Sequence, residues 1–223
     1  MSPLLANASG ALEASTLVIA ALFPIVNPIG SAAVFEALVD RFELSLQLQL
    51  AKKIAVYSFF LLFVSMLCGG KILSFFGVSL YSVQIGGGLV VAVNSWLLLS
   101  KDGNETDQAM LSADALMMRA FYPFTLPFTV GPGAISVAVA LGAHLPSELK
   151  TGSFSPLIVV VAALGALVIC ISVYICYRWA NPAEHLLGAT GATVVMRLSA
   201  FISLCIGVQI VTSGIRSYLG TIH

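Results

Sequence analysis

The sequence predicts an all-α polytopic membrane protein with six transmembrane helices. Hydrophobic residues make up 59% of its 223 residues and charged residues only 9%, whereas about a quarter of a soluble domain is charged. So few charges cannot cover a water-facing surface, which excludes a soluble globular fold, and the high hydrophobicity excludes disorder. The ten basic and ten acidic residues balance, so we expect no basic surface for nucleic acid.

Six apolar stretches are each long enough to cross a bilayer, which takes about 20 residues of α-helix. None alternates apolar and polar residues as a membrane β-strand does. The connections are short, so residues 1–223 are expected to form one transmembrane domain. The predicted spans are 15–39, 54–76, 80–100, 120–142, 156–178 and 197–218.

The first three spans carry distinct local signals. No Lys or Arg precedes the first span and two prolines interrupt it, so it does not resemble a cleaved signal peptide. The second ends near Lys71, whose long side chain can reach the membrane surface. The third contains the glycine run 86–88, which favours close packing of another helix or, alternatively, clears space for a moving helix or a ligand.

The last three spans add prolines, cysteines and an arginine. The fourth contains Pro127 and Pro132, and the sixth begins at Arg197, interpreted as an anchor at the inner membrane surface. All four cysteines fall in predicted spans without metal-ligand spacing, so we interpret them as small buried hydrophobic residues and predict no metal site. They are Cys68, Cys170, Cys176 and Cys205.

Basic residues predict the orientation of the chain. Lys and Arg concentrate in alternate loops, and such loops face the cytoplasm. The sequence therefore predicts a prokaryotic cell (inner) membrane protein with both termini outside. The inner set is Arg41, Lys52, Lys53, Lys101, Arg119, Arg178 and Arg197, and the outer set is Lys71, Lys150 and Arg216.

The two halves of the chain read alike. The first span contains Asn27-Pro28-Ile29-Gly30-Ser31, and the fourth contains Val130-Gly131-Pro132-Gly133-Ala134, each a few residues after another proline. Repeat 1 would cover about 15–100 and repeat 2 about 120–218. Because each has three spans, the second enters the membrane from the opposite side, which makes an inverted repeat of the kind found in secondary transporters.

The repeated motif predicts a break in each helix. Proline removes a backbone hydrogen bond, and it fits the first position of a new half-helix after a capping residue. Asn27 and Gly131 occupy the capping positions, so the N–H groups of residues 29–31 and 133–135 would be free at two positive helix ends. Such ends bind a small anion or carboxylate. The alternative is that the prolines and glycines serve packing only.

The predicted substrate site combines these backbone groups with nearby hydroxyl and amide side chains. Its residues are Asn27, Pro28, Ile29, Gly30, Ser31, Thr129, Gly131, Pro132, Gly133, Ala134 and Ser136. Glu36 is a candidate for proton coupling, although it also suits the cytoplasmic interface beside Asp40 and Arg41. Coupling to H⁺ or Na⁺ and uncoupled transport stay open, and no other cofactor is expected.

At these residues the sequence resembles the MarC family of integral membrane proteins, which includes the SnatA-type small neutral amino-acid transporters. The resemblance covers essentially the whole chain and implies transport of glycine-like or alanine-like substrates. Members often carry Asp at position 27 and Arg at position 84, where Asn27 and Gln84 stand here, so neither charge is present for coupling. The matching motifs are Asn27-Pro28-Ile29-Gly30, Gly86-Gly87-Gly88-Leu89, Pro127 with Gly131-Pro132-Gly133-Ala134, and Gly207-Val208-Gln209.

Other function classes fit less well. An enzyme is not expected, because the histidines lie in loops or at the terminus and no helix interior holds an Asp or a catalytic motif. A passive channel or permease for a small solute would show a ring of like polar residues along a continuous pore. A non-transport assembly role and a homo-oligomer are both left open. The expected partners are therefore a small neutral amino acid and the lipid bilayer.

Overall fold

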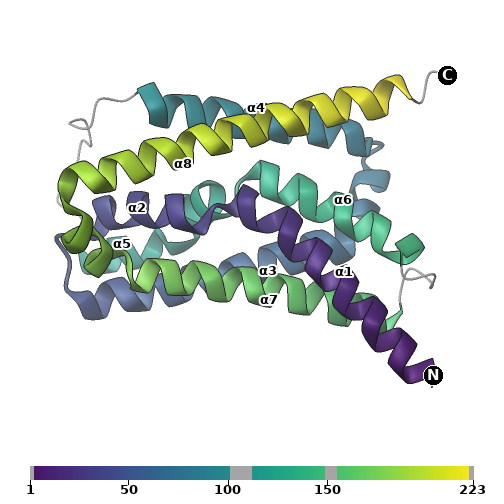
Figure 1. The fold of residues 1–223 in the computed structure, drawn as a ribbon, viewed down its shortest axis with the longest axis horizontal. Helices are drawn as coiled ribbons and strands as arrows, with labels where there is room; N and C mark the ends of the chain where they lie inside the picture. Colours follow the sequence, from purple (N-terminus) through teal and green to yellow (C-terminus); the bar gives the residue numbers. More distant parts are fainter. Residues whose placement is uncertain (1–2, 101–111, 149–154, 221–223) are drawn as a thin grey trace.

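The protein is a bundle of long helices. The computed structural model describes residues 3–100, 112–148 and 155–220, and every regular element in these ranges is a helix. Both ends of the described chain lie at the same end of the bundle (Figure 1). The helices are α1 Pro3–Val26, α2 Pro28–Val39, α3 Leu44–Phe75, α4 Leu80–Ser100, α5 Ala113–Met118, η1 Ala120–Thr129, α6 Pro132–Glu148, α7 Pro156–Arg178 and α8 Ala180–Leu219.

The helices supply the spans that the hydropathy predicts. Five apolar segments can each cross a membrane, and η1 with α6 forms a sixth that bends by 70°. The prediction of an all-helical polytopic membrane protein is therefore confirmed. The five are Gly10–Glu36, Leu44–Phe75, Leu80–Ser100, Pro156–Arg178 and Thr193–Leu219.

Three helices start well before their predicted positions, and α1 does so at Pro3 rather than at 15. Helix α3 begins at Leu44 rather than at 54, and α8 begins at Ala180 rather than at 197. The early part of α3 contains Gln47, Gln49, Lys52 and Lys53, whose polarity lowers its hydropathy. Gln and Lys are good helix formers, so the helix extends past the apolar stretch.

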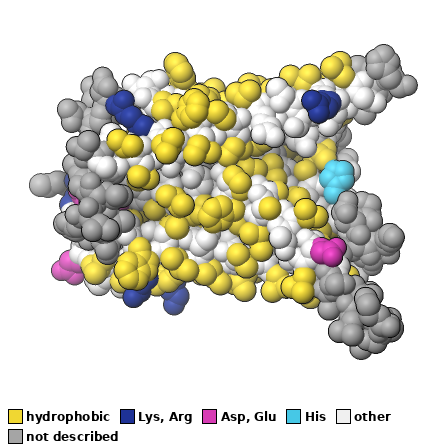
Figure 2. Space-filling view, in the orientation of Figure 1, with side chains coloured by type: hydrophobic (Ala, Val, Ile, Leu, Met, Phe, Trp, Pro, Cys, Tyr) yellow, Lys and Arg dark blue, Asp and Glu magenta, His cyan; other side chains and the backbone are white. Residues whose placement is uncertain are grey.

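The surface of the bundle is divided as a membrane protein requires. Hydrophobic side chains cover its side, whereas Lys, Arg, Asp and Glu gather towards the two ends (Figure 2). Exposed apolar residues such as Phe60, Leu97 and Phe201 belong to this surface. The interior is filled by residues such as Leu22 and Ile169, so core and exterior are both apolar.

The main contacts between helices in the first half of the chain have counterparts in the second half. Helices α1, α2, α3 and α4 correspond to η1, α6, α7 and α8 in this comparison. Helix α3 packs against α7, and α4 packs extensively against α8. The contacts of α3 with η1 and α6 correspond to those of α7 with α1 and α2. The contact of α4 with α6 corresponds to that of α8 with α2.

Glycines allow the closest of these contacts. A Cβ atom on Gly88 would lie 2.8 Å from the carbonyl oxygen of Gly207 on α8. A Cβ atom on Gly87 would lie 2.8 Å from Ser136 Oγ on α6. The packing interpretation of the glycine run is confirmed for these two residues, whereas a Cβ on Gly86 would meet nothing within 4 Å.

The cysteines do not share one environment. Cys170 is buried and Cys176 is half-buried, but Cys68 and Cys205 are exposed, so the expectation that all four are buried is wrong for those two. The reason is that apolar residues are equally suited to the interior and to the lipid-facing surface. Among the described residues, no group of His, Cys, Asp and Glu could hold a metal ion.

Candidate functional site

The first helix break is formed by Asn27. Helix α1 ends at Val26 and α2 begins at Pro28, while Asn27 adopts the left-handed conformation with φ 47° and ψ 62°. Asn tolerates this conformation better than most residues because its side chain can hydrogen-bond locally. The side-chain oxygen of Asn27 accepts a hydrogen bond from the Gly30 N–H at 3.2 Å. Asn27 is therefore the N-cap of α2.

The same side chain attaches the break to α8. Asn27 Nδ2 donates to Ser203 Oγ at 2.9 Å and to the backbone oxygen of Ser199 at 3.3 Å. A Cβ atom on Gly30 would lie 2.5 Å from Ser199 Cβ, so α2 and α8 are in close contact here. The break is thus held by contacts from a helix far away in the sequence.

Most of the backbone N–H groups at this break already donate hydrogen bonds within the protein. Gly30 N–H is bonded to Asn27 Oδ1, and Ser31 N–H donates to the Asn27 backbone oxygen at 3.0 Å. The expectation that both are free is wrong, because Asn27 and the first helical bond satisfy them. Ile29 is the remaining member of that set, and its side chain is exposed.

The second break has a different geometry. Pro123 and Pro127 lie inside η1, the backbone is non-helical at Tyr122 and Leu126, and the chain bends by 70° before α6 begins at Pro132. Gly131 offers no side chain to cap α6. Within the described part of the chain, the N–H groups of Gly133 and Ala134 have no hydrogen-bond partner. Ile135 N–H, which was also expected to be free, donates to the Gly131 oxygen at 3.1 Å.

A buried tyrosine of α7 links the second break to α2. Thr129 Oγ1 donates to the Phe124 backbone oxygen at 2.7 Å, so the Tyr177 hydroxyl is the donor in its 2.7 Å hydrogen bond with Thr129 Oγ1. The Phe35 ring stacks on Tyr177 with a centroid distance of 4.4 Å. Helix α7 thereby connects Phe35 of α2 to Thr129 of the second break.

A cavity of about 310 Å³ lies between the breaks, with α4 and α8 forming further walls. The structure brings seven of the predicted site residues to it: Asn27, Gly30, Ser31, Thr129, Gly131, Pro132 and Ala134. The lining also includes polar residues that sequence reasoning missed, namely Asn94 and Ser95 on α4 and Ser199 and Ser203 on α8, and apolar side chains such as Val26, Leu98 and Phe128.

The other predicted residues lie around the cavity rather than on its wall. Pro28 is buried and Ile29 faces outward. Gly133 is buried, and a Cβ atom there would meet the Val91 side chain of α4. Ser136 is buried and donates to the Gly133 oxygen at 2.8 Å.

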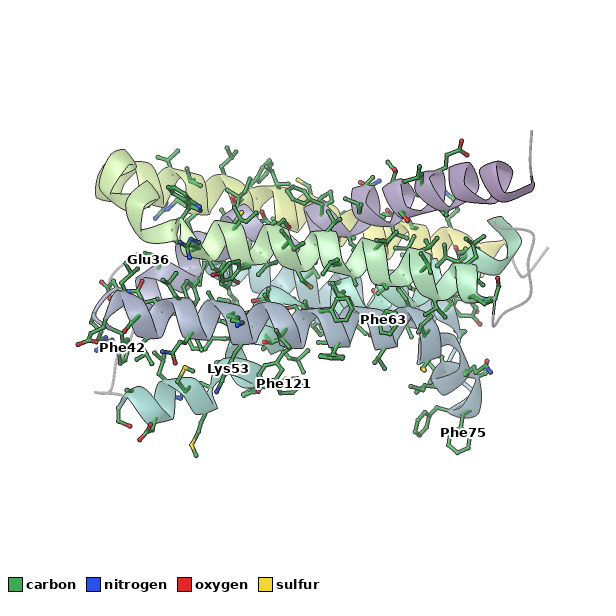
Figure 3. All side chains as sticks on the ribbon, turned by 90° about the horizontal axis from the view of Figure 1, so that it is seen from below. Glu36, Phe42, Lys53, Phe63, Phe75 and Phe121 are labelled. Carbon is green, nitrogen blue, oxygen red and sulfur yellow. The ribbon has the colours of Figure 1, made fainter. Side chains whose placement is uncertain are left out.

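Glu36 is buried with only 2% of its surface exposed, although it does not line the cavity. Figure 3 shows it toward the end of the bundle where α2 ends. Asp40 and Arg41, beside which an interfacial position was expected, are exposed, whereas Glu36 is buried.

A signal for the missed polar residues was present in the sequence. Asn94 and Ser95 lie within an apolar span, and Ser199 and Ser203 are four residues apart, on one face of a helix. Polar side chains inside a membrane helix are costly and often mark a pathway for solutes. Tyr177 gave no such signal, because Tyr beside Arg178 is typical of a membrane interface.

The lining suits a small, polar and uncharged or zwitterionic molecule. The described lining residues offer hydroxyl and amide groups together with the backbone of Gly131 and Ala134, and no charged side chain is among them. The volume is at the lower end of that of ligand pockets, which hold roughly 300–1,000 Å³. Because Ala134 N–H at the start of α6 is without a partner, it can donate to a carboxylate oxygen.

Comparison with known proteins gives a consistent result. The family described as "MarC family integral membrane protein" matches residues 12–219. A "UPF0056 membrane protein" of Archaeoglobus fulgidus is 32% identical over 203 residues, covering 89% of this chain and 90% of that protein. An "UPF0056 inner membrane protein MarC" of Salmonella paratyphi B and another of Citrobacter koseri are each 26% identical over 211 residues, covering 91% of this chain and 94% of the relative. No solved structure gives a significant match.

Proposed function

The chain belongs to the MarC family of integral membrane proteins, and we propose that it is a secondary transporter whose substrate occupies the cavity between the two helix breaks. The observation that carries this proposal is the cavity itself. Both broken spans, α4 and α8 contribute polar groups to it. Irregular backbone inside a membrane is tolerated where it lines such a cavity.

The repeated architecture supports alternating access. The main helix contacts are the same when the two three-span halves are exchanged, and α2 and α6 both begin at a proline that follows a break. We infer that the halves form an inverted repeat. In transporters of this kind, one unit moves against the other around a central site and exposes it to each side in turn.

The proposed substrate is a small neutral amino acid such as glycine or alanine. The resemblance described above implies this class, and the small uncharged cavity is compatible with it. The carboxylate would accept hydrogen bonds from the backbone at Gly131 and Ala134, and the ammonium group would donate to hydroxyl oxygens such as Ser31 Oγ and Ser203 Oγ.

Transport assays in proteoliposomes test this proposal. Labelled glycine and alanine should enter by counterflow against unlabelled amino acid inside, because a carrier exchanges substrate across the membrane and a passive channel does not. Imposed proton and sodium gradients then identify the coupling ion. Lack of binding and of counterflow for every small neutral amino acid would contradict the proposed function.

We also propose that the membrane is the inner membrane of a prokaryote, with both chain termini outside. The bacterial relatives are named inner membrane proteins, and the described Lys and Arg residues gather mainly at the end opposite the termini (Figures 1 and 2). Lys101 and Lys150, which contribute to the sequence argument, lie outside the described residues. The positive-inside rule assigns the richer end to the cytoplasm.

Cysteine labelling tests this orientation in a variant without the four native cysteines. Gln47, a position that the loop pattern suggests for labelling, is buried, so the exposed Ser45 is the better site. Ser45→Cys should be shielded from an impermeant thiol reagent in intact cells, whereas Ser217→Cys near the C-terminus should react. The reverse result would overturn the orientation. Two further loop positions suited to the same assay, Asp107 and Gly152, lie outside the described residues.

A further inference from the structure

A second hollow lies on the lipid-facing side of the bundle, between α3 and α7. This groove has a volume of about 520 Å³ and shares no residue with the cavity at the helix breaks. Ala55 and Cys170 are its most buried members and form the floor. The walls are the larger side chains of Val56, Phe59, Phe60, Leu167, Ile171 and Tyr174.

The groove follows both helices along the membrane normal. On α3 it is lined at positions 52, 55, 56, 59 and 60, and on α7 at 167, 170, 171 and 174, which is the spacing of one face of a helix. The stretch from 52 to 60 extends about 12 Å. Because α3 and α7 are antiparallel neighbours (Figure 3), Lys52 and Tyr174 lie at the same end of the groove.

Positive charge is concentrated at that end. Lys52 lines the groove and is exposed. Tyr174 also lines it, and its hydroxyl accepts a 3.4 Å hydrogen bond from the Arg178 guanidinium. The next residue, Trp179, is 61% exposed, as is typical of an aromatic side chain at the membrane surface. The opposite end is formed by Phe59, Phe60 and Leu167 and carries no charge.

We propose that the groove is a binding site for an anionic phospholipid. The phosphate would lie against Lys52 and Arg178, and one acyl chain would lie along the apolar floor towards Phe60. A lipid has this distribution of charge and apolar length, and basic pockets between membrane helices are known to bind anionic headgroups. An extended peptide would leave unpaired backbone groups in the hydrocarbon, which makes it a poor occupant. This proposal does not depend on the transport function.

Native mass spectrometry of the purified full-length protein tests the site. With phosphatidylglycerol added, the parent protein should retain the lipid more strongly than it retains phosphatidylcholine. Each lost cation should weaken retention about fivefold, so the double variant Lys52→Gln/Arg178→Gln should lose about 25-fold. Equal retention by that variant and the parent would overturn the proposal, and so would equal retention of the two lipids.

Two control substitutions distinguish binding at this groove from a general attraction of anionic lipid to the positive charges of the protein. Lys53 is exposed, but it lies on a different face of α3 from the groove. It is one turn before Tyr57, whose ring centroid is 5.8 Å from that of Phe121 on η1 (Figure 3). Lys53→Gln should therefore change retention less than about twofold, and Lys71→Gln at the far end of α3 should behave alike. A loss as large as that of the double variant would show that no local site exists.

The role of the acyl chain is tested separately. Ala55→Leu fills the floor of the groove and should reduce retention of phosphatidylglycerol while Lys52 and Arg178 remain. Glycerol phosphate, which has the headgroup charge but no chain, should not bind measurably. If glycerol phosphate bound as tightly as the lipid, the site would be a phosphate site and the lipid proposal would be wrong.

Discussion

The two helix breaks place a proline at the same position of their half-helices, but they satisfy their backbone in opposite ways. At the first, the Asn27 side chain caps Gly30 and is attached to Ser199 and Ser203 of α8. At the second, Gly131 cannot cap α6, and the chain bends by 70°. The first break is therefore closed by its own side chain, while the second leaves backbone donors for a ligand.

This difference assigns separate tasks to two motifs that look equivalent in the sequence. The first break fixes the position of α2 against α8, so its residues should matter mainly for stability and for helix arrangement. The second break presents Ala134 N–H beside a glycine that lines the cavity, so its residues should matter mainly for binding. Substitutions at matched positions can separate these roles.

The largest expected effect is at Gly131. A Cβ atom there would meet only the Pro127 oxygen, at 3.0 Å, while the rest of a side chain would enter the cavity. Gly131→Leu should therefore abolish amino-acid binding, measured as ligand-induced thermal stabilisation of the purified protein. Gly86→Leu is the matched control, since that position is open, and it should bind like the parent. Normal amino-acid binding by Gly131→Leu would show that the substrate does not bind beside Gly131.

Asn27→Ala should have the largest effect on stability. The variant loses the cap of α2 and two hydrogen bonds to α8, and alanine is strained in the left-handed conformation. We expect a loss of about 2–3 kcal/mol, seen as a lower unfolding temperature. Asn27→Gly should lose about 1 kcal/mol less, because glycine adopts this conformation freely. Asn94→Ala on α4 serves as the control and should have little effect. Equal stabilities of the alanine and glycine variants would show that backbone strain is unimportant here.

Asn27→Asp distinguishes capping from ligand binding at the first break. Aspartate keeps the oxygen that caps Gly30 but loses the donors to α8, and it places a negative charge near the bound carboxylate. We expect roughly tenfold weaker amino-acid binding at pH 8. Binding should recover as the pH falls, since protonation removes the charge and restores one donor. Affinity that is the same at pH 8 and pH 5 would argue that the carboxylate binds far from this break.

The smallest effect concerns the hydrogen bond between α7 and the second break. Tyr177→Phe removes the hydroxyl that donates to Thr129 but keeps the ring stacked on Phe35. Stability should fall by about 1 kcal/mol. A double-mutant cycle with Thr129→Val should give a coupling energy of similar size. Tyr174→Phe, at the lipid groove, is the control for loss of a tyrosine hydroxyl and should show no coupling to Thr129. Zero coupling between Tyr177 and Thr129 would mean that this hydrogen bond does not hold the second break to α7.

The sequence by itself determined the membrane class, the spans and the residues at which α2 and α6 begin. These features follow from local chemistry: apolar length sets a span, and proline cannot continue a hydrogen-bonded helix. The difference in capping between the two breaks could also be predicted in part, because Asn27 can cap a helix through its side chain whereas Gly131 cannot.

Tertiary structure decided which residues surround the cavity. It brought Ser203 and Tyr177 to the breaks, turned Gly133 towards Val91 and buried Glu36. It also left Cys68 exposed and Cys170 buried. The physical reason is that lipid and protein interior are both apolar, so hydropathy does not reveal which face of a membrane helix looks inward. Only the packing of the helices, through glycine contacts such as Gly88 against Gly207, makes that choice.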